Sequence, residues 1–169
     1  MDNILLPPPA QHLEDASVRG GLDLLVFAHK SHLQRADDEL DRLGLGRAHH
    51  RMLYFVARRP GMMTSELIDM LQITKQSAAR VLSALTDKGY LRQAACEHDR
   101  RRRLLYLTPG GTALEERIAA ELRQNMKRAY AEAGEEAVRG YWMMMQRLMT
   151  PEMRRHFQSF YEGAARSSD

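Results

Sequence analysis

Apolar residues recur every three or four positions along most of the chain, which is the period of one face of an α-helix. This pattern predicts helices over 17–43, 47–58, 64–71, 75–88, 109–133, 135–149 and 151–162. Strand-like sequence is confined to 90–95 and 103–107, with Met62 and Met63 as a possible minimal third strand. The expected fold is therefore mostly α, with one small hairpin.

The order of elements between Thr64 and Thr108 is distinctive. Two short helices are separated by a tight turn, and Thr74 can cap the second one because its hydroxyl can accept from an unpaired backbone N–H. Gly89 supplies a left-handed stop. The two strands follow, with a polar tip between them. This order predicts a winged helix-turn-helix, in which one helix enters the DNA major groove and the hairpin lies beside it.

The helices outside this segment suggest how the chain is organised. We expect an extended N-terminal arm over 1–16, a winged helix-turn-helix over 44–111 and a frayed tail over 163–169. The apolar stripes of 17–43 and 112–162 are larger than a small core can cover, and such stripes usually mark a partner surface. These segments are predicted to be dimerisation helices of a homodimer, the alternative being an intramolecular bundle.

Charge strengthens the prediction of DNA binding. The chain has 25 Lys and Arg against 22 Asp and Glu, a net charge of only +3. Residues 74–103 hold eight basic and three acidic residues, which gives this segment +5. Positive charge thus collects on the expected reading head, as phosphate binding requires.

Composition excludes several other classes of protein. The chain lacks both an apolar run of the roughly 20 residues that span a bilayer and the basic start of a signal peptide. Its single cysteine, Cys96, fits a reducing compartment, so we expect a cytoplasmic protein. Sequence motifs of phosphate loops, nucleophilic hydrolases and metalloproteases are missing, so we expect no enzyme and no cofactor.

Three short motifs resemble the MarR family, the multiple-antibiotic-resistance regulators of bacteria. Residues 99–101 read Asp-Arg-Arg and are followed by Leu-Tyr-Leu-Thr at 105–108. Lys-Gly-Tyr-Leu at 88–91 is similar to the family's turn into the wing, and Pro60-Gly61 lies ahead of the helix-turn-helix. Gly46 departs from the family's capping threonine, which leaves the start of the helix at 47 less well fixed.

The resemblance implies a homodimer clamped by its terminal helices. Residues 74–88 would enter the major groove of a pseudo-palindromic operator, and the 96–103 wing would enter the minor groove. Such proteins are mostly repressors that release DNA when a small phenolic or lipophilic effector binds, or when a cysteine is oxidised. Reactive cysteines of such sensors lie in the first helix, so Cys96 is expected to be an ordinary thiol.

The start of the reading helix supplies the candidate major-groove contacts. Gln76 could pair with adenine and Arg80 with guanine, because each of these side chains can form two hydrogen bonds with the edge of that base. Lys75 and Ser77 are expected to hold phosphates, and Thr74 is expected to be mainly a cap. Simple solvent exposure is the alternative for all five.

The polar tip of the hairpin supplies the candidate minor-groove contacts. Alternate residues of a strand share a face. Arg101 is therefore assigned to the groove with Asp99 orienting it, while Arg100 and Arg102 face the phosphates. The Asp99–Arg101 pair would add little to the stability of the fold, since exposed ion pairs contribute about 0–1 kcal/mol.

Histidines and aromatic residues suggest an effector pocket between the first two helices, with His32, His50 and Tyr54 as candidate lining residues. His29 lies on an apolar stripe and is expected in the core. The histidine spacings do not form a tight ligand set, so a metal site is not expected. Two other functions remain open: a sequence-tolerant architectural DNA-binding protein without an effector, and a winged helix that binds protein.

Overall fold

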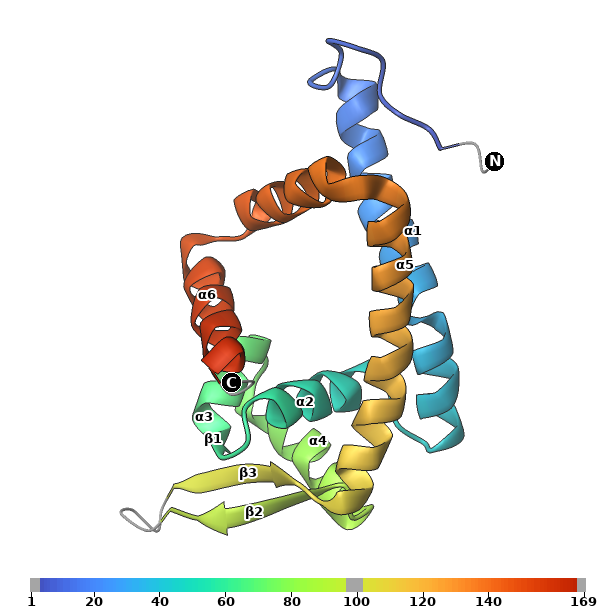
Figure 1. The fold of residues 1–169 in the computed structure, drawn as a ribbon. Helices are drawn as coiled ribbons and strands as arrows, with labels where there is room; N and C mark the ends of the chain where they lie inside the picture. Colours follow the sequence, from blue (N-terminus) through green and yellow to red (C-terminus); the bar gives the residue numbers. More distant parts are fainter. Residues whose placement is uncertain (1–3, 97–101, 167–169) are drawn as a thin grey trace.

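The computed structural model describes residues 4–96 and 102–166. Over these residues the chain forms a winged helix-turn-helix from which long helices extend (Figure 1). The elements are α1 (Asp15–Arg42), α2 (Arg47–Arg58), β1 (Met62–Met63), α3 (Thr64–Leu71), α4 (Lys75–Asp87), β2 (Leu91–Ala95), β3 (Arg103–Leu107), α5 (Pro109–Leu148) and α6 (Pro151–Arg166). The mostly α winged fold predicted from the sequence is confirmed.

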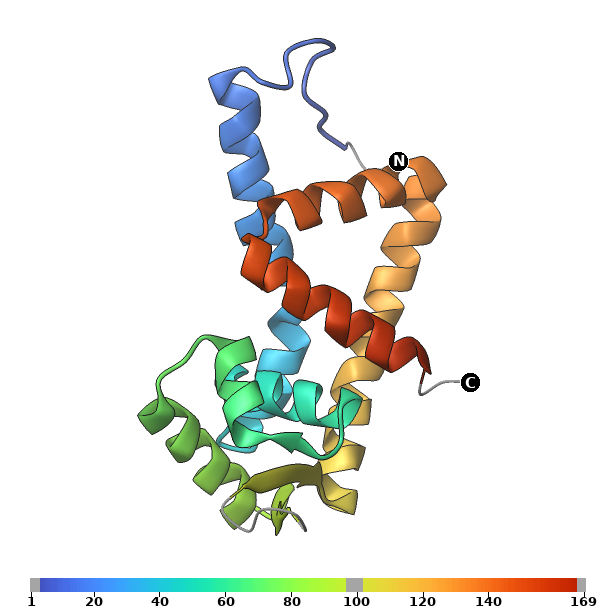
Figure 2. The same ribbon diagram turned by 90° about the vertical axis from the view of Figure 1, so that its left-hand side faces the viewer.

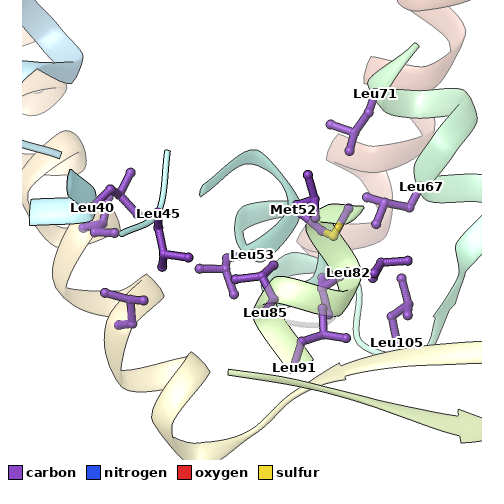
Figure 3. Close-up of a cluster of buried hydrophobic side chains, with 14 of the residues drawn as sticks. Leu40, Leu45, Met52, Leu53, Leu67, Leu71, Leu82, Leu85, Leu91 and Leu105 are labelled. Carbon is purple, nitrogen blue, oxygen red and sulfur yellow. The ribbon is translucent and has the colours of Figure 1, made fainter. Parts of the chain in front are cut away.

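A small antiparallel sheet and three short helices enclose one hydrophobic core. The strand order is β1-β3-β2, with β3 paired to both neighbours. The core is dominated by leucine, and Figure 3 shows side chains from the ends of α1 and α5 meeting those of α2, α3, α4 and the sheet. Its fully enclosed members include Leu40, Leu53, Leu67, Leu85, Leu91, Leu105 and Leu114.

Side-chain caps fix the helix starts where the sequence suggests them. The Thr108 hydroxyl accepts from the Gly111 N–H at 3.1 Å with Pro109 in the first turn, and the Thr150 hydroxyl accepts from the Met153 N–H at 3.2 Å. The expected weakness at Gly46 is offset locally. His49 Nδ1 accepts from the Gly46 N–H at 3.0 Å, which is the half of a capping box that a glycine N-cap allows.

The start of α5 is joined tightly to the base of the hairpin. The Thr108 hydroxyl donates to the Gly89 carbonyl, and the Thr108 N–H donates to the Tyr90 carbonyl at 3.1 Å. A Cβ at Gly111 would lie 1.9 Å from the Tyr90 carbonyl oxygen. Only glycine fits there, so the helix and the hairpin base are in direct backbone contact.

The helix α5 bends sharply at Gly134, where φ is +80° and ψ is 167°. Its first half runs beside α1, its second half turns away, and α6 returns toward α2 (Figures 1 and 2). There the Phe160 ring lies 5.1 Å from the Phe55 ring. The helix α6 continues to Arg166, so the frayed tail does not begin at Gly163 as the sequence suggested.

Much of α1 is uncovered in the single chain. Only Ala36 and Leu40 of this helix are buried, and residues 21–31 are all exposed. His29 is among them, so its expected place in the core is wrong for the single chain. Across the described residues, none of the helices combines the length and apolar character needed to cross a membrane.

Candidate nucleic-acid interface

The first turns of α4 present a polar surface held in place by its cap. The Thr74 hydroxyl accepts from the Ser77 N–H at 3.1 Å and donates to the Ser77 hydroxyl at 3.0 Å. Lys75, Gln76, Ser77 and Arg80 are exposed, as the sequence suggested. Thr74 is exposed as well and serves as the cap, so all five predicted residues lie at one end of the helix.

The opposite face of α4 anchors it in the core through Ala78, Val81, Leu82 and Leu85. Ala79 and Ser83, which sequence reasoning did not select, are also exposed on the polar face. Both are small and carry no charge, so their position on the helix was the only available signal. An alanine methyl there could contact a thymine methyl in the major groove.

The turn before α4 is braced from two sides. Gln72 adopts a left-handed conformation with φ +51°, and its side-chain amide donates to the Asp69 carbonyl at 2.7 Å. Arg51 of α2 donates to the Leu71 carbonyl at 3.2 Å. These bonds use carbonyls that the end of a helix leaves unpaired. They fix the angle at which α4 leaves α3.

The strand pairing of the hairpin ends at Ala95–Arg103, and the Cys96 N–H donates to the Arg102 carbonyl at 3.1 Å. Arg102 is exposed, and its guanidinium lies 3.8 Å from the Met63 sulfur. Asp99, Arg100 and Arg101 lie outside the described residues. Cys96 is half-buried at the point where the hairpin leaves the described part of the chain.

Two exposed arginines on the paired strands add to the charge of the hairpin. Arg92 lies near the base of the hairpin, and Arg103 lies in the pair farthest from the base. The Arg92 guanidinium stacks on Tyr106 of the paired strand, 4.5 Å from the ring centre. Gly61 lies against the Tyr106 hydroxyl, since a Cβ built on this glycine would be 3.0 Å from it. The pairing register shows this cross-strand arrangement, whereas the sequence indicated only the charge.

Two of the three proposed effector residues, His50 and Tyr54, lie one turn apart on α2 but have different surroundings. Tyr54 accepts a hydrogen bond from Arg58 at 2.9 Å, and its ring lies 6.4 Å from Phe160 of α6. His50 is buried, and its Nε2 atom has no hydrogen-bond partner among the described residues. His32 of α1 is half-buried.

Burial changes the titration of both histidines. It lowers the pKa of His50, and the Asp37 carboxylate nearby opposes this effect only in part. Burial also lowers the pKa of His32, with His29 adding to the shift. The neutral imidazole is therefore the favoured form of both. Neutral His50 can donate or accept through a ring nitrogen that the rest of the described chain does not use.

The described residues contain no cluster of three or more His, Cys, Asp or Glu side chains suited to a metal ion. A hollow of about 1130 Å³ lies elsewhere, between the second half of α5 and α6. Sequence reasoning did not find this hollow, because it depends on how the two helices meet after the bend at Gly134.

Comparisons with known proteins agree with this geometry. A family model described as the MarR family matches residues 43–102. The HTH-type transcriptional regulator PetP of Rhodobacter capsulatus is 39% identical over 146 residues, which cover 86% of this chain and 88% of that protein. The putative transcriptional regulatory protein for the hcr operon of Thauera aromatica is 33% identical over 75 residues, 44% of this chain and 45% of that protein.

Solved structures share the fold. The crystal structure of MarR matches with a TM-score of 0.61 and 24% identity, covering 80% of this chain and 90% of that one. NadR in complex with 4-hydroxyphenylacetate matches with a TM-score of 0.64 and 20% identity, covering 85% of this chain and 97% of that one. Fold and relatives together define a winged-helix, DNA-binding regulator of transcription. The chain belongs to the MarR family.

Proposed function

We propose that the protein is a homodimeric, sequence-specific repressor that releases its operator when a small effector binds. The observation that carries the DNA part of this proposal is the exposed start of α4. There Lys75, Gln76 and Arg80 extend from a helix whose other face is fixed in the core. In the proposed complex α4 enters the major groove and the 96–103 wing follows the minor groove. Arg101 then inserts in the minor groove, oriented by Asp99, with Arg100 on a phosphate.

The uncovered helices support dimerisation. On α1 the stripe of Val18, Leu22 and Leu25 is exposed, and so are Leu24 and Phe27 on the opposite side of the helix. A helix that is apolar on both sides is normally enclosed on both sides. Such a surface supports an intertwined pair of chains, which would also supply two reading heads for a two-fold symmetric operator.

The second half of α5 carries a matching set of exposed apolar residues, Tyr141, Met143, Met144 and Leu148. Methionine side chains adapt their shape to a partner surface. Exposed apolar residues gathered on two helices in this way usually mark a surface that contacts a partner. The dimerisation helices of the proposal are therefore 17–43 and 112–162, and the DNA-binding unit is 44–111.

The unpartnered nitrogen of His50 supports an effector site. A buried polar atom without a partner is unfavourable, and a ligand carboxylate or hydroxyl could satisfy it. NadR is a structural relative seen with 4-hydroxyphenylacetate, and PcaV of Streptomyces coelicolor is one seen with its natural ligand. We propose a phenolic or otherwise largely apolar effector that contacts His50 together with His32 or Tyr54.

Footprinting on genomic DNA tests the proposal. A regulator protects short sites with two-fold symmetry, whereas a sequence-tolerant architectural protein coats DNA without such sites.

Titrating aromatic acids such as 4-hydroxyphenylacetate into the protected complex tests the effector. Loss of release in His50→Ala/Tyr54→Ala, with operator affinity retained, would support the assigned pocket. Release that survives this double change but is lost in Cys96→Ser would identify thiol chemistry as the signal instead.

A further inference from the structure

The N-terminal arm and the hollow between α5 and α6 have complementary chemistry. The arm, residues 4–13, contains Ile4, Leu5, Leu6 and Leu13, each between 77% and 82% exposed, and three consecutive prolines at 7–9. Every residue from 4 to 16 is exposed, so the arm of the single chain does not lie in its own hollow. In Figures 1 and 2 it lies at the end of the molecule farthest from the hairpin.

The hollow has a rigid aromatic wall. Trp142 of α5 donates from its indole N–H to the Tyr130 hydroxyl at 2.9 Å. Its ring meets Phe157 and Tyr161 of α6 edge to face, at 6.2 and 5.5 Å between ring centres. Trp142 and Tyr161 line the hollow together with Val138 and Met143. The wall is thus fixed from three sides before anything binds.

Proline-rich segments are suited to such a wall. Three prolines hold their backbone in or near the extended left-handed polyproline II conformation, so little conformational freedom is lost when the segment binds. Aromatic grooves are the usual receptors for segments of this kind. The three aliphatic residues before the prolines add apolar surface that only burial would remove from water.

Charged residues near the arm and most of those lining the hollow are of opposite sign. Three arginines and one acid line the hollow: Arg139, Arg147, Arg154 and Glu136. Arg139 and Arg147 have no carboxylate partner among the described residues. Glu14 is the N-cap residue of α1, and Asp23 lies within α1. Neither has a basic partner within the same described ranges. Two acids beside the arm could therefore meet two arginines beside the hollow.

We propose that the arm of one chain docks in the α5–α6 hollow of a second copy of the chain. This inference rests on the proposed homodimer and adds the arm to its interface. It commits to a second copy because the arm continues directly into α1, whose exposed stripe is the proposed dimer face. The aliphatic residues and prolines would cover Trp142, and the acids at the start of α1 would face the arginines.

Trp142 is the only tryptophan of the chain, so its fluorescence reports on the hollow directly. The full-length chain is compared with Leu5→Ser/Leu6→Ser, both as dimers verified by sedimentation. The wild-type emission should lie at shorter wavelength and be less accessible to acrylamide. A peptide of residues 4–13 should return the variant toward the wild-type emission, and a peptide with the prolines replaced by glycine should do so less effectively.

Mixed dimers separate docking between chains from docking within one. The Leu5→Ser/Leu6→Ser chain, which keeps Trp142, is mixed with a Trp142→Phe chain whose arm is intact. If the arm docks on the partner, the remaining tryptophan should recover the shorter-wavelength emission. The contrary outcome is a mixed dimer whose emission equals that of the Leu5→Ser/Leu6→Ser homodimer, while the wild-type homodimer still differs from that variant. In that case the arm binds its own chain and the proposal is wrong.

Equal emission from wild type and Leu5→Ser/Leu6→Ser in dimers that still protect an operator would overturn the arm proposal alone. A fluorescence difference without any protected site would instead count against the proposed function and leave the arm proposal standing. A wild-type chain that stays monomeric at micromolar concentration would overturn both.

Discussion

At the scale of single residues, Thr74 and Ser77 act on each other before either meets DNA. Their mutual hydrogen bonds fix the first turn of α4 and leave Lys75, Gln76 and Arg80 as the unconstrained polar side chains. The sequence could predict this cap because capping depends on neighbours three residues apart. Which bases the free side chains contact depends on the operator, so those assignments remain predictions.

Arg80→Ala should reduce operator affinity by about 1–3 kcal/mol and relax specificity at one base pair, because a guanine would lose a two-bonded partner. Lys75→Ala, at the first residue of the same helix, is the matched control. It should weaken binding about equally on all sequences, since a phosphate contact carries no base information. Affinities for the operator and its single-base variants measure both effects. Equal weakening on every sequence by Arg80→Ala would assign Arg80 to the phosphates.

His50 should make the fold less stable at acidic pH. Its pKa is lowered by burial, so the folded state binds this proton less readily than the unfolded state, whose value is near 6.5. The contribution of His50 is therefore complete above about pH 6.5 and is lost as pH falls toward the folded value. Glu115 acts in the opposite direction, because burial raises its pKa above 4.5, and its contribution falls as pH rises from there.

Denaturant unfolding of wild type and His50→Gln between pH 5 and 8 checks this sign. Glutamine keeps a polar side chain but cannot take up a proton in this range. The variant should lose less stability than wild type as pH falls from 6.5. An identical pH slope in the two proteins would show that His50 does not control the acid sensitivity.

At the scale of elements, the bend at Gly134 determines where the second half of α5 and α6 lie. A residue with a Cβ is strained at φ +80° and ψ 167°, at a cost of order 1–3 kcal/mol. Gly134→Ala should therefore lower the melting temperature or straighten α5, and it should weaken dimerisation. The sequence located this bend, since an isolated glycine between two helical patterns is a recognisable signal.

Gly20→Ala is the control for that change. Gly20 lies inside α1, and a Cβ there meets nothing within 4 Å. Alanine in a helix interior is more favourable than glycine by about 0.5–1 kcal/mol, so this variant should be slightly more stable. Thermal unfolding and sedimentation of both variants make the comparison. Equal behaviour of the two would mean that the bend has no special role.

Local signals and long-range ones differ in how well the sequence reveals them. The starts of α4, α5 and α6 followed from Thr74, Thr108 and Thr150, because a cap involves only nearby backbone. The exposed position of His29 could not be predicted in this way. An apolar stripe on a helix indicates that the stripe is covered, but it does not identify the segment or chain that covers it. The hollow beside Trp142 depends on two helices meeting after a bend, and no periodicity in the sequence records that meeting.

At the scale of the whole molecule, binding should depend steeply on salt. A dimer would bring two copies of the α4 start and two wings to the phosphates, and each neutralised phosphate releases bound counterions. With roughly 6–10 phosphate contacts, affinity should fall by about 10³–10⁵ between about 50 and 200 mM salt. Operator titrations across that range provide the measurement. A nearly flat response would contradict an electrostatic role for the wing.

The contact of Gly111 with Tyr90 has a mechanical consequence. The start of α5 touches the hairpin base backbone to backbone, and Thr108 bonds to the carbonyls of Gly89 and Tyr90. There is no side chain between them to absorb movement. A small rotation of α5 about its own axis would therefore be transmitted as torque to the hairpin, and the distant tip would sweep through the largest arc. The proposed effector would bind at α2, which packs against α5, and a shift of α5 caused in this way could withdraw the proposed wing from DNA without contact between effector and wing.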